Sequence, residues 1–177
     1  CRSKKLPYRK LEQLLPKVAE LNKTAIETAL AFDIHSCTDI TGFGLMGHTL
    51  EMARGSKVRI ALSFSSLPVH PYAIDMYRKG ETTGSNKANR KMVDGWWNRE
   101  LKLERAEEEL LFDPQTSGGL LISLPLAQGE ELVRKLKQSG VNDAALVGKV
   151  VAAEQKNREA IIKTLAFFTW KIHCLTS

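Results

Sequence analysis

The sequence predicts an α+β or α/β domain in which helices pack on a β-sheet. Apolar residues recur at helical spacing in some segments and alternate with polar residues in others, and glycines or prolines separate these segments. The length of 177 residues suits a single domain, and 43% hydrophobic with 26% charged residues is ordinary for a globular protein. Disordered, collagen-like and fibrous classes are therefore excluded.

The first elements are expected to be helical. Residues 1–14 are assigned to a linker or a frayed end, because the chain opens with basic residues that lack periodicity. Apolar residues then follow helical spacing from Leu11 to Phe32. Pro16 is expected to divide this stretch into two helices, because its ring clashes with the preceding turn.

The rest of the chain alternates between strand-like and helix-like segments. Residues 86–110 are highly charged and allow no assignment, and residues 152–177 form an extra tail of unknown role after the domain at 15–151. The expected elements are a β-leaning segment at 34–44, a helix at 44–53 that ends at Gly55, a strand at 58–64, a helix at 71–79, polar loops at 80–86 and 111–119, a strand at 120–124, a helix at 126–138 and a strand at 144–151.

Charge and cysteine content narrow the possible functions. The net charge is +6, with an excess of four positive charges in each of residues 1–30 and 131–177 and a deficit of two between them. This basic excess forms no stripe with interleaved aromatic residues, which favours solvated basic faces over a nucleic-acid site. The three cysteines form no C-x-x-C pair, and no apolar run could span a membrane, so we expect a cytoplasmic protein. Because the chain begins at Cys1, we also expect a piece of a longer protein.

The first candidate site is the segment Asp39-Ile-Thr-Gly-Phe-Gly44. A carboxylate ends a short strand, and Thr41, Gly42 and Gly44 lead into a helix. Glycines let a backbone approach a ligand closely, and the first N–H groups of a helix attract anions. A carboxylate beside a phosphate can hold Mg²⁺. From spacing alone, a turn that is merely capped by Asp39 is the favoured explanation.

The second candidate site is Asp113-Pro-Gln-Thr-Ser-Gly-Gly119, which combines a proline-fixed turn, small hydroxyl residues and paired glycines. It could face an anion or simply form a tight connection into the strand at 120–124. Four other features are weaker candidates for functional sites, and for each a purely structural role is favoured. We expect His48 to be a core histidine, Cys37 a buried inert thiol, the Trp96-Trp97 pair to have one ring packed inward, and Glu107 to Glu109 to form a solvated face.

Together these two segments resemble the C-terminal half of the selenophosphate synthetase (selenide, water dikinase) family. Asp39-Ile-Thr-Gly-Phe-Gly-Leu-Met-Gly-His48 and Phe112-Asp-Pro-Gln-Thr-Ser-Gly-Gly-Leu-Leu121 carry the resemblance, in this order and about 70 residues apart. The segments 21–23, 63–68 and 80–86 also fit the family pattern. The resemblance covers about residues 15–151, and the wider group is the aminoimidazole-ribonucleotide-synthetase-like ATP-using enzymes.

The resemblance implies an enzyme that makes selenophosphate from selenide, ATP and water and releases AMP and phosphate. It implies Mg²⁺ on the ATP phosphates, with Asp39 as a metal ligand and Thr41, Gly42 and Gly44 near the nucleotide. The catalytic Cys or selenocysteine belongs to a missing N-terminal domain of the same chain, so this fragment carries no catalytic residue and is expected to be inactive alone. The full-length family members are homodimers.

The same resemblance implies a three-layer α/β/α fold with a mixed sheet of about four strands, partly like a ferredoxin-like fold. Residues 86–110, with Trp96 and Trp97, and the tail 152–177 depart from the family pattern. The rival hypotheses are a non-catalytic basic binding or regulatory domain and a purine-pathway relative. The second is disfavoured by the loop at 113–116. No membrane or nucleic-acid partner is expected.

Overall fold

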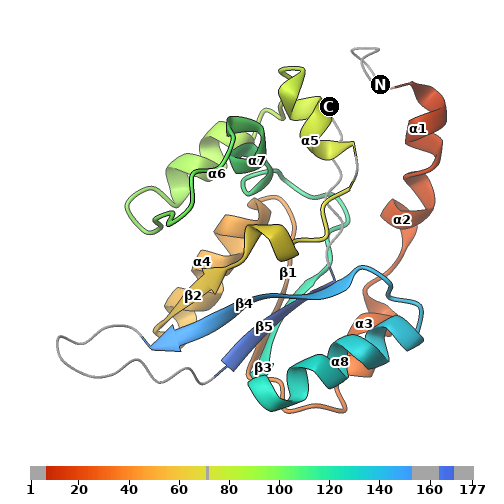
Figure 1. Cartoon of the computed structure of the whole chain (residues 1–177), viewed down its shortest axis with the longest axis vertical. Helices are drawn as coiled ribbons and strands as arrows, with labels where there is room; N and C mark the ends of the chain where they lie inside the picture. The colour runs from red at the N-terminus through yellow and green to blue at the C-terminus, as the bar shows by residue number, and fades with distance from the viewer. Residues whose placement is uncertain (1–6, 71, 153–163, 170–177) are drawn as a thin grey trace.

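The computed structural model describes residues 7–70 and 72–152, and residues 164–169 as backbone. It confirms the α+β class, with helices packed on a single sheet (Figure 1). The helices are α1 Tyr8–Glu12, α2 Leu15–Ala19, α3 Lys23–Ala29, α4 Gly44–Ser56, the 3-10 helix η1 Phe64–Ser66, α5 Ala73–Arg78, α6 Asn86–Met92, α7 Arg105–Leu110 and α8 Leu126–Gln138. The strands are β1 Ser36–Asp39, β2 Val58–Leu62, β3 Leu120–Pro125, β4 Ala144–Ala152 and β5 Thr164–Thr169.

The five strands form one sheet in the order β1-β3-β5-β4-β2, and each of these described pairs is antiparallel. The expected mixed sheet of about four strands is therefore wrong. Strands β3 and β4 run in the same direction and are joined through α8, but β5 lies antiparallel between them. This is a split β-α-β unit. The reason for the error is that β5 comes from the segment 152–177, for which the sequence predicts no strand.

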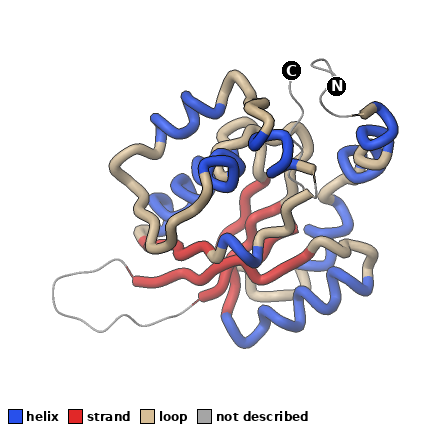
Figure 2. The backbone as a smooth tube through the Cα atoms, turned by 45° about the horizontal axis from the view of Figure 1, so that its top comes forward, coloured by secondary structure: helices blue, strands red, loops and turns tan. Residues whose placement is uncertain are grey.

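Helices cover both faces of this sheet (Figures 1 and 2). Along β3, alternate side chains enter two separate apolar clusters: Leu121 packs with residues of α4, α5 and α7, whereas Leu120 and Ile122 pack with α3 and α8. Successive side chains of a strand point to opposite faces, so a strand covered on both sides is apolar throughout. The continuous apolar run at 120–124 has this cause.

Several helix boundaries differ from those expected. Pro16 lies in the first turn of α2, directly after the break between α1 and α2, where its missing N–H costs nothing. A second break, not expected from the sequence, separates α2 from α3. Residues 8–12, within the segment assigned to a linker or frayed end, form α1, none of whose residues is buried. Gly55 does not end α4, because the helix continues to Ser56 and Lys57 caps it with a positive φ of 53°.

The later elements follow the expected order. The helix at 126–138 and the strands at 58–62, 120–125 and 144–152 occupy the predicted places. The unassigned segment 86–110 contains α6 and α7, which pack beside α4 and α5. Of the tail 152–177, the structure describes residue 152 and β5, and the rest lies outside the described residues.

Gly148 offers a test of the sheet register. It pairs with Leu62 at the point where the pairing of β4 with β5 shifts, and a Cβ there would overlap the carbonyl oxygen of Ala61. We expect Gly148→Ala to lower the free energy of unfolding by about 1–3 kcal/mol, because the strands must separate. Chemical denaturation measures this change.

Gly55→Ala is the matched control. A Cβ at Gly55 meets no atom within 4 Å, and the residue lies in the last turn of α4. Alanine should raise stability there by about 0.5–1 kcal/mol. Equal effects of the two substitutions would contradict the close approach at Gly148.

Candidate functional site

Asp39 lies at the end of the edge strand β1 and is exposed. It pairs with Leu120 of β3, and directly paired residues of neighbouring strands share a face. Asp39 therefore lies on the face of the sheet that α3 and α8 cover. Its carboxylate stands where the chain leaves the sheet, accessible to a ligand in solvent.

Thr41, Gly42 and Gly44 form the turn between β1 and α4. Gly42 is exposed, and a Cβ on it would meet no atom within 4 Å, so its backbone is open to an approaching group. Gly44 is buried, has a φ of +68°, and a Cβ on it would lie 2.8 Å from the carbonyl carbon of Phe112. Its N–H group donates to the Thr41 carbonyl at 3.0 Å. Gly44 is thus required for close packing of the turn itself.

The structure brings the two glycine-containing segments together, although about 70 residues separate them in the chain. The Gln115 N–H donates to the Thr41 carbonyl at 3.0 Å, and the Ile40 N–H donates to the Gly119 carbonyl at 2.9 Å. A Cβ at Gly118 would overlap the carbonyl oxygen of Ile40. The two segments therefore form one backbone surface beside Asp39.

Two asparagines outside these segments hold this surface in place. The Asn89 side-chain amide donates to the carbonyls of Gly42 at 2.8 Å and Phe112 at 2.9 Å, and so joins both turns. The Asn22 amide donates to the Gly118 carbonyl at 3.1 Å, which places the start of α3 at the same site. Each contact satisfies a backbone acceptor that the turns leave without a secondary-structure partner.

Asp113 is fully buried beneath this surface. Its carboxylate accepts hydrogen bonds from the Tyr77 hydroxyl at 2.5 Å and from the Gln115 amide at 2.8 Å. The pKa of Asp113 is raised to about 7, mainly by burial and also by the charge of Glu109, while the two hydrogen-bond donors lower it in part. Asp113 is therefore a carboxyl group that titrates near neutral pH.

Both protonation states of Asp113 can be satisfied by the surrounding side chains. The Tyr77 oxygen also lies 3.2 Å from Oδ1 of Asn86, an atom that accepts from the Thr83 hydroxyl as well. When Asp113 is ionised, Tyr77 donates to it. When Asp113 is protonated, it can donate to the Tyr77 oxygen while Tyr77 donates to Asn86.

Of the weaker site candidates, His48 and the tryptophan pair behave as expected and Cys37 does not. His48 is a buried histidine, as expected, with Nε2 3.1 Å from the Thr41 hydroxyl. Trp97 packs edge-on against Phe112, while Trp96 is 61% exposed, which confirms that one ring of the pair is packed inward. Cys37 is exposed, not buried as expected, and it lies on β1, the strand at the edge of the sheet. Partial desolvation of the thiol by its neighbours and the charge of Asp39 raise the pKa of Cys37.

The three glutamates are not a solvated face. Glu108 and Glu109 are partly buried, and both form ion pairs with Arg90. This arrangement places the Arg90 guanidinium over the Phe112 ring, with its centre 4.3 Å away. The sequence alone does not predict these ion pairs, because the two glutamates lie 18 and 19 positions from Arg90, on another helix.

Tyr77 and Asn89 were not predicted from the sequence as residues of this site. One feature of the sequence does point to Asn89: Asn86 and Asn89 are three residues apart and so share one face of a helix. Asparagine is unfavourable inside helices, so a pair on one face indicates side-chain hydrogen bonds to something else. Within the described part of the chain, no group of three or more His, Cys, Asp or Glu side chains could hold a metal ion, so Asp39 stands as a single carboxylate.

Because of Asp113, we expect the free energy of unfolding to depend on pH. The unfolded chain loses this proton near the usual pKa of 3.8, whereas the folded protein keeps it until about pH 7. The stability should therefore fall as the pH rises between these values, by up to about 4 kcal/mol, and stay level above them. Urea denaturation from pH 4 to pH 8 measures this slope.

Asp113→Asn should flatten this part of the pH profile, because the amide cannot ionise. Asp94→Asn, at an exposed aspartate, should leave the slope unchanged. A wild-type profile that rises from pH 4 to pH 7 and is insensitive to Asp113→Asn would contradict the buried carboxyl.

Comparison with known proteins gives similarities over most of the chain. A selenide, water dikinase of Clostridioides difficile is 39% identical over 145 residues, which cover 82% of this chain and 42% of that protein. One of Desulfitobacterium hafniense is 41% identical over 147 residues, and one of Caldanaerobacter subterraneus is 42% identical over 131 residues. These cover 81% and 73% of this chain and 42% and 38% of the relatives. The chain thus spans about two fifths of the length of these proteins.

The family comparison agrees with this pattern. The model of the C-terminal domain of AIR synthase related proteins matches residues 2–160, which include both glycine-containing turns and the helices that hold them. In the part of the chain that the structure describes, no helix is long and apolar enough to cross a membrane. This chain therefore belongs to the AIR synthase related family and matches the C-terminal domain of a selenophosphate synthetase.

Proposed function

We propose that this chain is the C-terminal part of a selenide, water dikinase and helps to close its Mg-ATP site. One observation carries the proposal. The two segments that resemble the family's motifs converge on a single backbone surface, which leaves Asp39 and Gly42 exposed beside it. The similarity to selenide, water dikinases extends over both segments.

The exposed groups suit a magnesium-bound phosphate. Mg²⁺ is usually held by one or two carboxylates together with phosphate oxygens and water. Asp39 would supply such a carboxylate, and the open backbone at Thr41 and Gly42 allows phosphate oxygens to come close, with Gly44 packing the turn behind them. Bound Mg²⁺ would neutralise phosphate charge, which is the main requirement of phosphoryl transfer. The protein groups bind and orient the nucleotide.

The proposed site is incomplete within this chain. A single carboxylate cannot hold several magnesium ions against water, and the exposed surface beside Asp39 faces solvent. The remaining ligands and the catalytic Cys or selenocysteine would come from an N-terminal domain, in a full-length enzyme that forms a homodimer. The relatives are long enough to contain such a domain, because this chain matches only about two fifths of them.

The finer features of the fold are also part of the proposal. A three-layer, partly ferredoxin-like arrangement is supported by helices on both faces of the sheet and by the split β-α-β unit at β3, α8 and β4. In this arrangement, β1 at the sheet edge presents Asp39 to a neighbouring domain.

Asp39→Asn in the intact enzyme tests the metal ligand. The amide has the same shape but no charge, so selenide-dependent AMP release from ATP should fall by at least about a hundredfold. Raising the Mg²⁺ concentration should restore part of the loss. Asp94→Asn is the control for removal of an exposed carboxylate and should retain full activity. Full activity of Asp39→Asn would refute the assignment.

Residues 1–177 alone should release no AMP above background with ATP, Mg²⁺ and selenide. The reason is that the chain offers one exposed carboxylate at the proposed site and none of the described residues form a metal-binding cluster. Measurable turnover by this chain would show that the site is complete without an N-terminal domain.

A further inference from the structure

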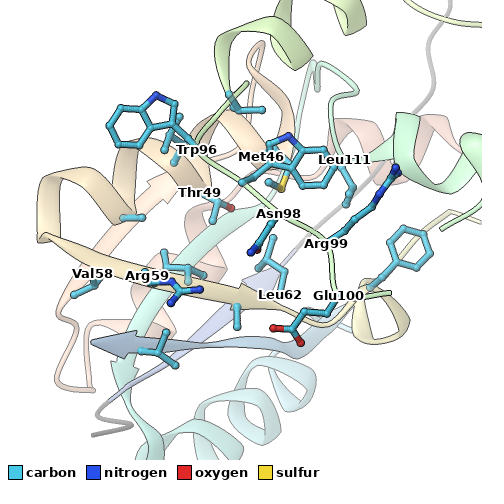
Figure 3. Close-up of a pocket in the computed structure, with 18 of the residues that line it drawn as sticks. Met46, Thr49, Val58, Arg59, Leu62, Trp96, Asn98, Arg99, Glu100 and Leu111 are labelled. Carbon is cyan, nitrogen blue, oxygen red and sulfur yellow. The ribbon is translucent and has the colours of Figure 1, made fainter. Parts of the chain in front are cut away.

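A cavity of about 670 Å³ lies between α4, β2 and the loop at 96–103 (Figure 3). It shares α4 with the candidate site. However, the residues that line it do not include Asp39, Thr41 or Gly42, or any residue of the turn at 112–119. Its size is typical of small-molecule sites, which range over roughly 300–1,000 Å³. The cavity is therefore a separate feature of the molecule, large enough for a ligand.

Most of the cavity wall is apolar. Its lining includes Leu50 of α4, Ile60 and Leu62 of β2, and Trp97 of the loop. These side chains are only partly buried in the protein as it stands. An apolar ligand body would remove the rest of their surface from water, which is the main favourable contribution to binding in such pockets.

One polar group in this wall has no partner. Thr49 is 5% exposed, and its Oγ1 atom is buried without a hydrogen bond. A threonine inside a helix usually bonds to the carbonyl four residues earlier, and a buried hydroxyl without any bond is destabilising. Thr49 is one of the residues that line the cavity (Figure 3), so its hydroxyl is a candidate hydrogen-bond partner for a polar group of a ligand.

The rim of the cavity is basic. Four cationic side chains and a single acidic one border it: Arg54, Lys57, Arg59, Arg99 and Glu100. Arg99 is paired with Glu108, and Arg54 lies over the Trp96 ring with 4.7 Å between its guanidinium carbon and the ring centre. Lys57 has no ion-pair partner among the residues that the structure describes. The rim therefore complements an anionic group.

The positions along α4 define the shape of the ligand. Thr49 and Lys57 are eight residues apart, so they are separated by about 12 Å along the helix axis. Ala53 lies midway, and its small side chain leaves the cavity open between them. We propose that this cavity binds an amphipathic carboxylate, with its apolar chain along α4, its carboxylate at Lys57 and a hydrogen-bonding group at Thr49.

Isothermal titration calorimetry on the whole chain, with three probes of matched chain length, tests this proposal. Decanoate should bind saturably, and ω-hydroxydecanoate should bind about fivefold more tightly, as expected for one additional hydrogen bond. Decan-1-ol should bind about two- to fivefold more weakly than decanoate, as expected for the loss of one exposed ion pair. No saturable binding of either acid would overturn the proposal.

Two variants assign the ends of the ligand. Thr49→Val should abolish the preference for ω-hydroxydecanoate while raising the melting temperature of the free protein, because the unpaired hydroxyl is gone. Lys57→Asn keeps a residue that tolerates positive φ and should abolish the preference for decanoate over the alcohol. Lys137→Asn, at an exposed lysine on α8, is the matched control and should change neither preference.

A third variant locates the ligand. Ala53→Phe should fill the middle of the cavity and remove binding, and Ala53→Leu is the smaller alternative if the first variant unfolds. Unchanged binding in a folded Ala53 variant would place the ligand elsewhere and refute the site. An unchanged preference for ω-hydroxydecanoate in Thr49→Val would refute the role of its hydroxyl.

Discussion

The direct packing of one backbone turn on another is the constraint on which the candidate site depends. Gly44 and Gly118 lie so close to the carbonyl groups of Phe112 and Ile40 that neither position has room for a methyl group. The Asn89 amide then joins the two turns through one hydrogen bond to each. This contact fixes the path of the chain next to Asp39, and it places that carboxylate beside the two glycine-containing turns.

The buried polar groups beneath this surface connect it to the helices above the sheet. Tyr77 of α5, Asn86 of α6 and Glu109 of α7 form hydrogen bonds that converge on Asp113 and its neighbours. Because these groups are shielded from water, the loss of any one partner would leave an unsatisfied polar atom. The network that supports the turns therefore also fixes the positions of the three helices. Asp113 changes its charge near neutral pH, and because it is fully buried, this change affects its hydrogen-bond partners in the network and is not screened by water.

Helix α4 serves two different parts of the molecule. Its first residue packs against the second glycine-containing turn, while the side chains of its later turns form one wall of the apolar cavity. Leu45 and Met52 of this helix are buried in the main core, and His48 on the same face is also buried, so the core fixes the helix between the two features. Arg90, held by Glu108 and Glu109 over Phe112, adds a further contact between α6 and the turn.

The sequence by itself determined the local elements and the exposed part of the site. Helical periodicity predicted α8, and the short apolar run at 120–124 predicted β3. The glycine spacing around Asp39 and at 113–119 predicted both turns, because helix and turn geometry depend on near neighbours in the chain. Only the tertiary structure decided that β5 lies between β3 and β4, that Asn89 joins the turns and that Thr49 is left unpaired. These features depend on contacts between residues far apart in the chain, and no local pattern specifies which distant backbone group a strand edge or an amide will meet.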